Sequence, residues 1–258
     1  MRLGILKSGN LSDEMATKYG QYPEVFARFF HDVAPQADVF SVDVNGGEPL
    51  PAAATIADGW LITGSRHGAY EDHGWIPPLK AFIREIVAAR VPLVGVCFGH
   101  QIIADALGGR TEKHVGGWGL GVHSYAPVDV PEWMGGFARP WTGHAMHQDQ
   151  VVDLPPTAQV LATSPFCRHA ALLYGDPERP DAISVQSHPE MSDQFVRDLI
   201  ETRMQHIIPK PVVDRALQDL GAPVTGREWA EVFIDYIRGG RAGQSAGGPS
   251  PGKTVDTG

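Results

Sequence analysis

The sequence predicts an α/β fold with an open, mostly parallel sheet, helices on both faces, and additional antiparallel edge strands. Short runs of apolar residues without polar alternation, such as Leu93–Val96, are typical of strands buried on both faces. Stretches with a helical period of apolar residues, such as Tyr22–Val33, separate these runs. The segment Gly116–Leu173 is less regular and richer in β signals, so it is expected to supply the antiparallel strands.

Each element is expected where an apolar pattern meets a turn or capping signal. We expect strands over residues 3–6, 39–44, 59–63, 92–96 and 182–186. We expect helices over residues 22–33, 76–89, 101–107, 195–207 and 228–237.

The chain is expected to form one domain followed by a tail. Residues 1–238 contain all the predicted strands and helices. From Gly239 onward the composition changes to Gly, Ser, Pro, Gln and Lys, with almost no apolar side chain to bury. Residues 239–258 are therefore predicted to be a disordered tail.

Charge and cysteine content exclude several classes of partner. The formal net charge is −9 and no run of Lys or Arg forms a basic stripe, so neither nucleic acid nor an anionic membrane is an expected partner. The N-terminus lacks the features of a signal peptide, and no apolar run approaches the roughly 20 residues of a membrane span. With only two cysteines, Cys97 and Cys167, we expect free thiols and a cytoplasmic location.

A candidate nucleophile lies between a predicted strand and a predicted helix, in the run Gly95-Val96-Cys97-Phe98-Gly99. Glycines two positions on either side leave room for the sharp turn that presents a nucleophile. The N-terminus of the following helix favours the thiolate, and the Phe98 N–H is placed to stabilise an oxyanion. A single Cys is more often an inert buried residue, but the two glycines favour the nucleophile.

A candidate base and its orienting carboxylate follow a short strand near the end of the domain, in the run Ser187-His188-Pro189-Glu190. A thiolate needs an imidazole to exchange protons with, and the imidazole needs a carboxylate to fix its tautomer. Two positions apart in extended backbone, the side chains of His188 and Glu190 point the same way. Alone, this pair is equally compatible with a surface loop, and it gains weight only from the cysteine turn upstream.

No metal or other cofactor is predicted. His144 and His147 are three residues apart, but no H-E-x-x-H motif or Cys/His cluster accompanies them. No glycine-rich nucleotide-binding pattern follows a strand.

Together these residues resemble the class I glutamine amidotransferase family. The run from Gly95 to Gln101 matches its G-[VI]-C-x-G-x-Q motif, and residues 188–190 match its H-P-E motif. The run Leu61-Ile62-Thr63-Gly64-Ser65 resembles its oxyanion loop, and residues 19–23 resemble members related to the GMP synthase amidotransferase. The resemblance covers residues 1 to about 203 and implies that residues 1–238 form the catalytic domain.

The resemblance also implies roles for individual residues. Cys97 would attack the side-chain amide of glutamine to form a γ-glutamyl thioester, with His188 moving protons and Glu190 orienting it. The backbone N–H groups of Gly64 and Phe98 would form the oxyanion hole. The residues implied to bind the small-molecule substrate are Gln101, His147, Gln148 and Asp149.

Three departures from the family pattern bear on the substrate. Ser187 replaces the usual Phe before the histidine, and Gln148 replaces a Gly in the glutamyl-binding loop. Arg66 and His67 stand in a loop that usually carries Pro and acidic residues. These two residues are interpreted either as determinants of a different acyl donor or as solvated loop residues.

Three functions remain open. The first is a glutaminase that supplies ammonia to a synthetase on a separate chain, because the domain occupies most of these residues. The second is a γ-glutamyl peptidase or hydrolase that acts on another γ-glutamyl amide. The third is a catalytically silent binding or regulatory protein on the same fold, against which the complete triad argues.

Overall fold

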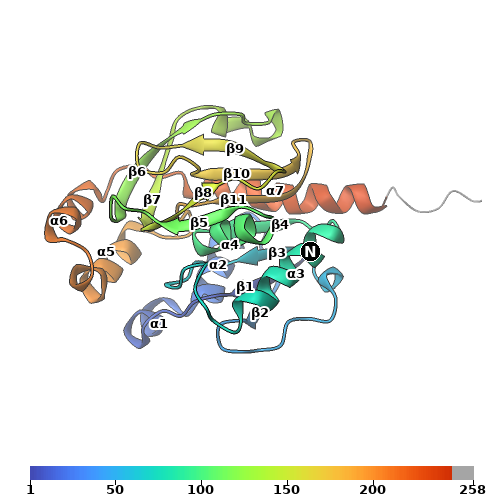
Figure 1. The fold of residues 1–258 in the computed structure, drawn as a ribbon, viewed down its shortest axis with the longest axis horizontal. Helices are drawn as coiled ribbons and strands as arrows, with labels where there is room; N and C mark the ends of the chain where they lie inside the picture. Colours follow the sequence, from blue (N-terminus) through green and yellow to red (C-terminus); the bar gives the residue numbers. More distant parts are fainter. Residues whose placement is uncertain (246–258) are drawn as a thin grey trace, which may run out of the picture.

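The computed structural model describes the backbone of residues 1–245 and the side chains of residues 1–239. Its centre is a sheet of nine strands in the order β2-β1-β3-β4-β11-β10-β9-β6-β7. Figure 1 shows this sheet crossing the molecule, with β1 and β2 at one end and β6 and β7 at the other. The predicted fold class is confirmed.

One half of the sheet is parallel and the other half antiparallel. The parallel strands are β1 (Arg2–Lys7), β2 (Asp38–Asp43), β3 (Gly59–Ile62), β4 (Leu93–Val96) and β11 (Arg179–Val185). The antiparallel strands are β6 (Gly119–Pro127), β7 (Trp141–His147), β9 (Ala158–Thr163) and β10 (Ala171–Asp176). A separate two-stranded sheet pairs β5 (Arg110–Lys113) with β8 (Asp149–Asp153).

Helices cover both faces of the sheet (Figure 1). The helices are α1 (Asp13–Tyr19), α2 (Tyr22–His31), α3 (Ile76–Ala88), α4 (Phe98–Ala106), α5 (Asp193–Thr202), α6 (Lys210–Asp219) and α7 (Gly226–Ser245). Short 3-10 segments occur at η1 (Ala54–Ile56), η2 (Glu132–Ala138) and η3 (Met204–His206). Among residues 1–245, no helix has both the length and the apolar character needed to span a bilayer.

Two hydrophobic cores lie on opposite faces of the sheet. Along β3 and β4 every residue is buried, and alternate side chains enter different cores. Leu61 and Val94 join the core beneath α2, α5 and α7, whereas Ile62 and Leu93 join the core beneath α3 and α4. A strand buried on both faces must be apolar throughout, which explains the uninterrupted apolar runs.

Among the differences from the sequence-based predictions, one helix has different ends and two helices were not predicted. The helix predicted over residues 195–207 begins earlier, because the Ser192 side chain caps it by accepting from the Phe195 N–H, and it gives way to η3 after Thr202. Helices α1 and α6 were not predicted. Each is short, and α1 buries only Met15 whereas α6 buries only two residues.

The predicted tail begins too early. Helix α7 continues through Gly239 to Ser245, so residues 239–245 are helical. Each glycine weakens a helix by about 1 kcal/mol relative to alanine, but a helix already nucleated by packed turns gains one hydrogen bond per added residue. The remaining part of the predicted tail, residues 246–258, lies outside the described residues.

The start of α4 lies directly against the end of β3. A Cβ atom added to Gly99, in the first turn of α4, would be 2.3 Å from the carbonyl oxygen of Ile62. A Cβ atom on Gly95 would in turn be 2.6 Å from the carbonyl oxygen of Gly99. Only residues without a side chain allow this packing, which fixes the position of the β4–α4 turn.

We predict that Gly99→Ala lowers the free energy of unfolding by about 2–3 kcal/mol, the upper range for overpacking a rigid site. Gly136→Ala is the matched control, because a Cβ at Gly136 meets no atom within 4 Å. Chemical denaturation of both variants checks this prediction. Equal stabilities for the two variants would show that the β3–α4 contact is not as close as described.

Candidate active site

Cys97 forms the turn between β4 and α4 in a strained backbone conformation. Its φ of 54° and ψ of −103° are rarely adopted by residues with a side chain, and cost of order 1–3 kcal/mol. Two hydrogen bonds hold the turn: the Cys97 N–H donates to Val185 (2.9 Å) and the Cys97 carbonyl accepts from the Gln101 N–H (3.1 Å). The turn predicted from the flanking glycines is therefore present, and Cys97 is a free thiol.

His188 follows β11 and lies beside Cys97. Its backbone N–H donates to the His144 carbonyl on β7 (2.8 Å), which ties the segment to the neighbouring sheet. Its Nδ1 is 2.7 Å from Oε1 of Glu190, and its ring lines the same cavity as the Cys97 side chain. The structure thus brings together the three residues predicted as a triad.

Burial and charge act in opposite directions on the imidazole. The side chains of His188 and Glu190 are 4% and 0% exposed, respectively. Burial alone lowers the pKa of His188, but the carboxylate of Glu190 and the thiolate of Cys97 outweigh it and raise the pKa to about 10. The site therefore favours the imidazolium form of His188.

Gly64 lies immediately over the nucleophile, at the end of β3. A Cβ atom placed on Gly64 would be 3.1 Å from Cε1 of His188 and 3.8 Å from Cβ of Cys97. Within residues 1–245, neither the Gly64 nor the Phe98 N–H donates to another protein group. Two free N–H donors flanking a nucleophile are the arrangement that binds a developing oxyanion.

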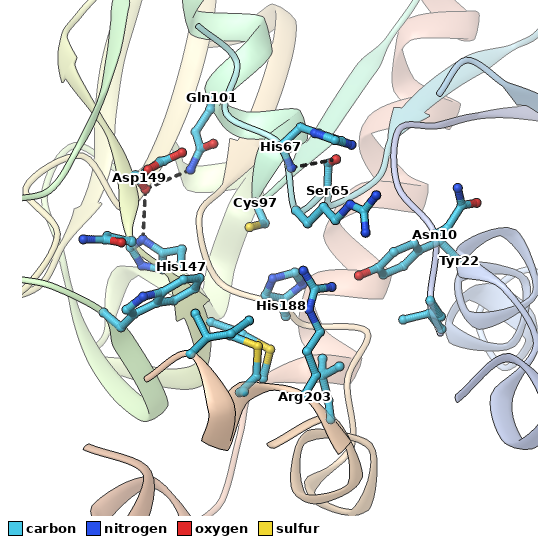
Figure 2. A pocket seen from close by; sticks show the side chains of 18 of the residues that line it. Asn10, Tyr22, Ser65, His67, Cys97, Gln101, His147, Asp149, His188 and Arg203 are labelled. Carbon is cyan, nitrogen blue, oxygen red and sulfur yellow. Dashed lines mark hydrogen bonds between the residues drawn. The ribbon is translucent and has the colours of Figure 1, made fainter. Parts of the chain in front are cut away.

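The four residues implied to bind substrate line the same cavity as Cys97 and His188, with a volume of about 270 Å³. Figure 2 shows Gln101, His147 and Asp149 on one side of Cys97, and Asn10, Tyr22 and Arg203 on the other. The cavity therefore extends past the nucleophile in two directions.

Protein contacts already occupy much of the predicted glutamyl side. The Gln101 amide donates to the Asp149 carbonyl (2.8 Å) and to Gln186 (3.2 Å), and the Gln148 amide donates to the His114 carbonyl (3.2 Å). These contacts indicate that Gln101 and Gln148 position the loop as well as line the cavity.

His147 and Asp149 differ in what they offer a substrate. Nδ1 of His147 lies 3.1 Å from the Asp149 carbonyl, and burial lowers the pKa of His147 to about 3, so its ring is neutral. The Asp149 carboxylate accepts from the Tyr70 hydroxyl (3.2 Å), and burial raises its pKa. Among these residues, Asp149 is thus the one that offers negative charge.

The positions of Arg66 and His67 only partly decide whether these residues select the acyl donor or are solvated loop residues. Arg66 is exposed at the mouth of the cavity, and His67 contacts Glu71 on the same loop. Both line the cavity, so neither is remote from the substrate.

Sequence reasoning missed Gln186, Tyr70 and Arg203. Gln186 lies two residues before His188, so the same alternation that paired His188 with Glu190 pointed to it. Tyr70 and Arg203 come from an irregular loop and from the end of α5, where no local pattern marks them. Cys167 is confirmed as a buried free thiol, and burial raises its pKa to about 12.

Comparisons with known proteins agree with this geometry. Residues 19–199 match the family model described as glutamine amidotransferase class-I. A relative named gamma-glutamyl peptidase 3, from Arabidopsis thaliana, is 26% identical over 88% of this chain and 93% of its own length. A glutamine-hydrolyzing GMP synthase subunit from Halobacterium salinarum is 34% identical over 67% of this chain and 86% of its own length.

A solved structure shares the fold over nearly the whole chain. The crystal structure of a glutamine amidotransferase from Methylobacillus flagellatus has a TM-score of 0.75, at 26% identity, and the match covers 92% of this chain and 94% of the other. The extent of this structural match, the family match and the arrangement around Cys97 all indicate the same family. This chain belongs to the class I glutamine amidotransferase family.

Proposed function

We propose that the protein hydrolyses a γ-glutamyl amide through a thioester on Cys97. The observation that carries the proposal is that Cys97 shares a cavity with an imidazole that is itself bonded to a buried carboxylate. Folding alone does not favour this arrangement, because a strained residue and a buried ion pair each cost stability. The arrangement argues against a catalytically silent protein.

The proposed reaction proceeds in two halves. The Cys97 thiolate attacks the γ-carbonyl carbon, and the N–H groups of Gly64 and Phe98 stabilise the oxyanion. The His188 imidazolium then protonates the leaving nitrogen as the C–N bond breaks. His188 next removes a proton from water, which attacks the thioester, releases glutamate and regenerates Cys97.

The glutamyl group would occupy the side of the cavity that contains Asp149. A γ-glutamyl substrate has an α-ammonium group, and the Asp149 carboxylate lines that side of the cavity. His147 would add a neutral ring wall, and Gln101 would keep the backbone of Asp149 in place.

Glutamine is the first candidate donor, with ammonia as the leaving group. The matched relative from Halobacterium salinarum belongs to a glutamine-hydrolyzing GMP synthase. By analogy, we propose that the ammonia is consumed by a synthetase on a separate chain. A cytoplasmic location is part of this proposal, supported by two free thiols.

A γ-glutamyl peptide is the second candidate, favoured by the space beyond Cys97. Ammonia needs little room, yet the cavity continues between Asn10, Tyr22 and Arg203 (Figure 2). Arg203 lines this part of the cavity, where its guanidinium would bind the carboxylate of a leaving amino acid. The relative that matches over 93% of its own length is named a gamma-glutamyl peptidase.

We predict that Cys97→Ser lowers kcat by at least about 10³-fold, as expected for loss of a nucleophile. His188→Ala should reduce kcat more than Glu190→Gln does, because Glu190 acts only through the imidazole. Glutamate release in steady state is the measurement, with the buried thiol variant Cys167→Ser as control. Wild-type turnover in Cys97→Ser would rule out the mechanism.

The pH dependence follows from the raised pKa of His188. Because its pKa is raised to about 10, the imidazolium persists as proton donor below that pH, and kcat/KM is expected to fall as pH rises through it. Glu190→Gln removes a charge that raises the pKa, so the descending limb should move to lower pH. A pH profile whose descending limb is identical in the two proteins would contradict the assigned role of Glu190.

The donor is tested by comparing glutamine with γ-glutamyl dipeptides. If peptides are the donor, their kcat/KM exceeds that of glutamine, and Arg203→Gln raises KM for the dipeptide by about tenfold, the effect of losing one charge-assisted hydrogen bond. Arg139→Gln, at an exposed arginine away from the cavity, is the control. A preference for glutamine that increases when a synthetase chain is added would instead identify the amidotransferase.

A further inference from the structure

Three side chains on the loop after β3 direct their ligand atoms at one point. Nδ1 of His67 is 3.2 Å from Oε2 of Glu71, and Nε2 of His73 is 2.7 Å from the same oxygen. The three ligand atoms all lie within 4.8 Å of one another. The sequence analysis predicted no metal after considering His144 and His147. It did not consider His67, Glu71 and His73 as ligands, because their spacing matches no metal-site motif.

The two separations from the Glu71 oxygen are close to those between donors around a bound transition-metal ion. With metal–ligand bonds of about 2.0–2.2 Å, neighbouring donors in a tetrahedral site lie roughly 3.3 Å apart. The His67 and His73 contacts to Glu71 need only a small expansion to reach that spacing. Two imidazoles and one carboxylate suit zinc, whereas Ca²⁺ and Mg²⁺ prefer oxygen ligands alone.

The surroundings hold the two rings and leave access from solvent. His73 stacks on Trp75 with the ring planes 12° apart, and the His67 ring meets His73 edge-on at 4.2 Å. The side chains of His67, Glu71 and His73 are 17%, 40% and 37% exposed, so water can complete the coordination.

We propose that His67, Glu71 and His73 bind one Zn²⁺ ion at the mouth of the cavity. His67 and Glu71 both line the cavity that contains Cys97. The ion would fix the loop between Gly64 and Trp75, whose ring packs on Phe98 at 5.5 Å. Zinc would therefore stiffen the segment that carries one of the two free N–H donors. The zinc proposal rests on the positions of these three ligand atoms and does not depend on the proposed hydrolysis.

Zinc binding is measured on full-length Cys97→Ser, because the thiolate and His188 could themselves bind zinc. Competition with a chromophoric chelator gives the stoichiometry and affinity. We expect one Zn²⁺ per chain, and at least about tenfold weaker binding in Cys97→Ser carrying His73→Gln or Glu71→Gln. His31→Gln, a matched change at an exposed histidine on α2, should bind like the parent.

X-ray absorption of zinc-loaded Cys97→Ser tests the ligand set without relying on the folding of further variants. Nitrogen and oxygen ligands including two imidazoles are expected. No zinc bound to Cys97→Ser, equal affinity in the His73→Gln and Glu71→Gln variants, or fewer than two imidazoles at the metal would each overturn the proposal. Any of these outcomes would leave the three residues as a hydrogen-bonded loop cluster.

Discussion

The active-site geometry depends on one close backbone contact, between the first turn of α4 and the end of β3. Since Gly99 has no side chain, α4 begins against the carbonyl of Ile62 and Cys97 is held in its strained turn. Gly64, two residues beyond Ile62, lies close to Cys97, since a Cβ placed on it would be 3.8 Å from the Cys97 Cβ. The proposed nucleophile and oxyanion donors are thus positioned by packed backbone, which would not reorganise during a reaction.

The part of this geometry that comes from short segments was predictable. The glycines on either side of Cys97 predict a turn that an ordinary strand–helix junction does not need. The pairing of His188 with Glu190 was also predicted, although Pro189 and Glu190 lie in a turn and not in the extended backbone that was expected. The fully apolar runs of β3 and β4 predicted a sheet covered on both faces. In each case neighbouring residues determine the result, so no knowledge of distant contacts was required.

The remainder depends on segments that meet only in the folded chain. The contact of Tyr70 with Asp149 joins two loops far apart in the sequence, and Arg203 reaches the cavity from the end of α5. Helix α6 buries only Val213 and Ala216, and it packs against β6, which is distant in the sequence. The cluster of His67, Glu71 and His73 forms in an irregular loop. Such a loop has no regular spacing from which the converging side chains could be predicted.

The most direct test of the central claim is to trap the covalent intermediate. The protein is mixed with a γ-glutamyl substrate, quenched in acid within the first turnover, digested and examined by mass spectrometry. We expect a γ-glutamyl group attached to the peptide that contains Cys97, and none on the peptide that contains Cys167. Substrate turnover with no acyl group on Cys97, under conditions in which a thioester survives the quench, would contradict it.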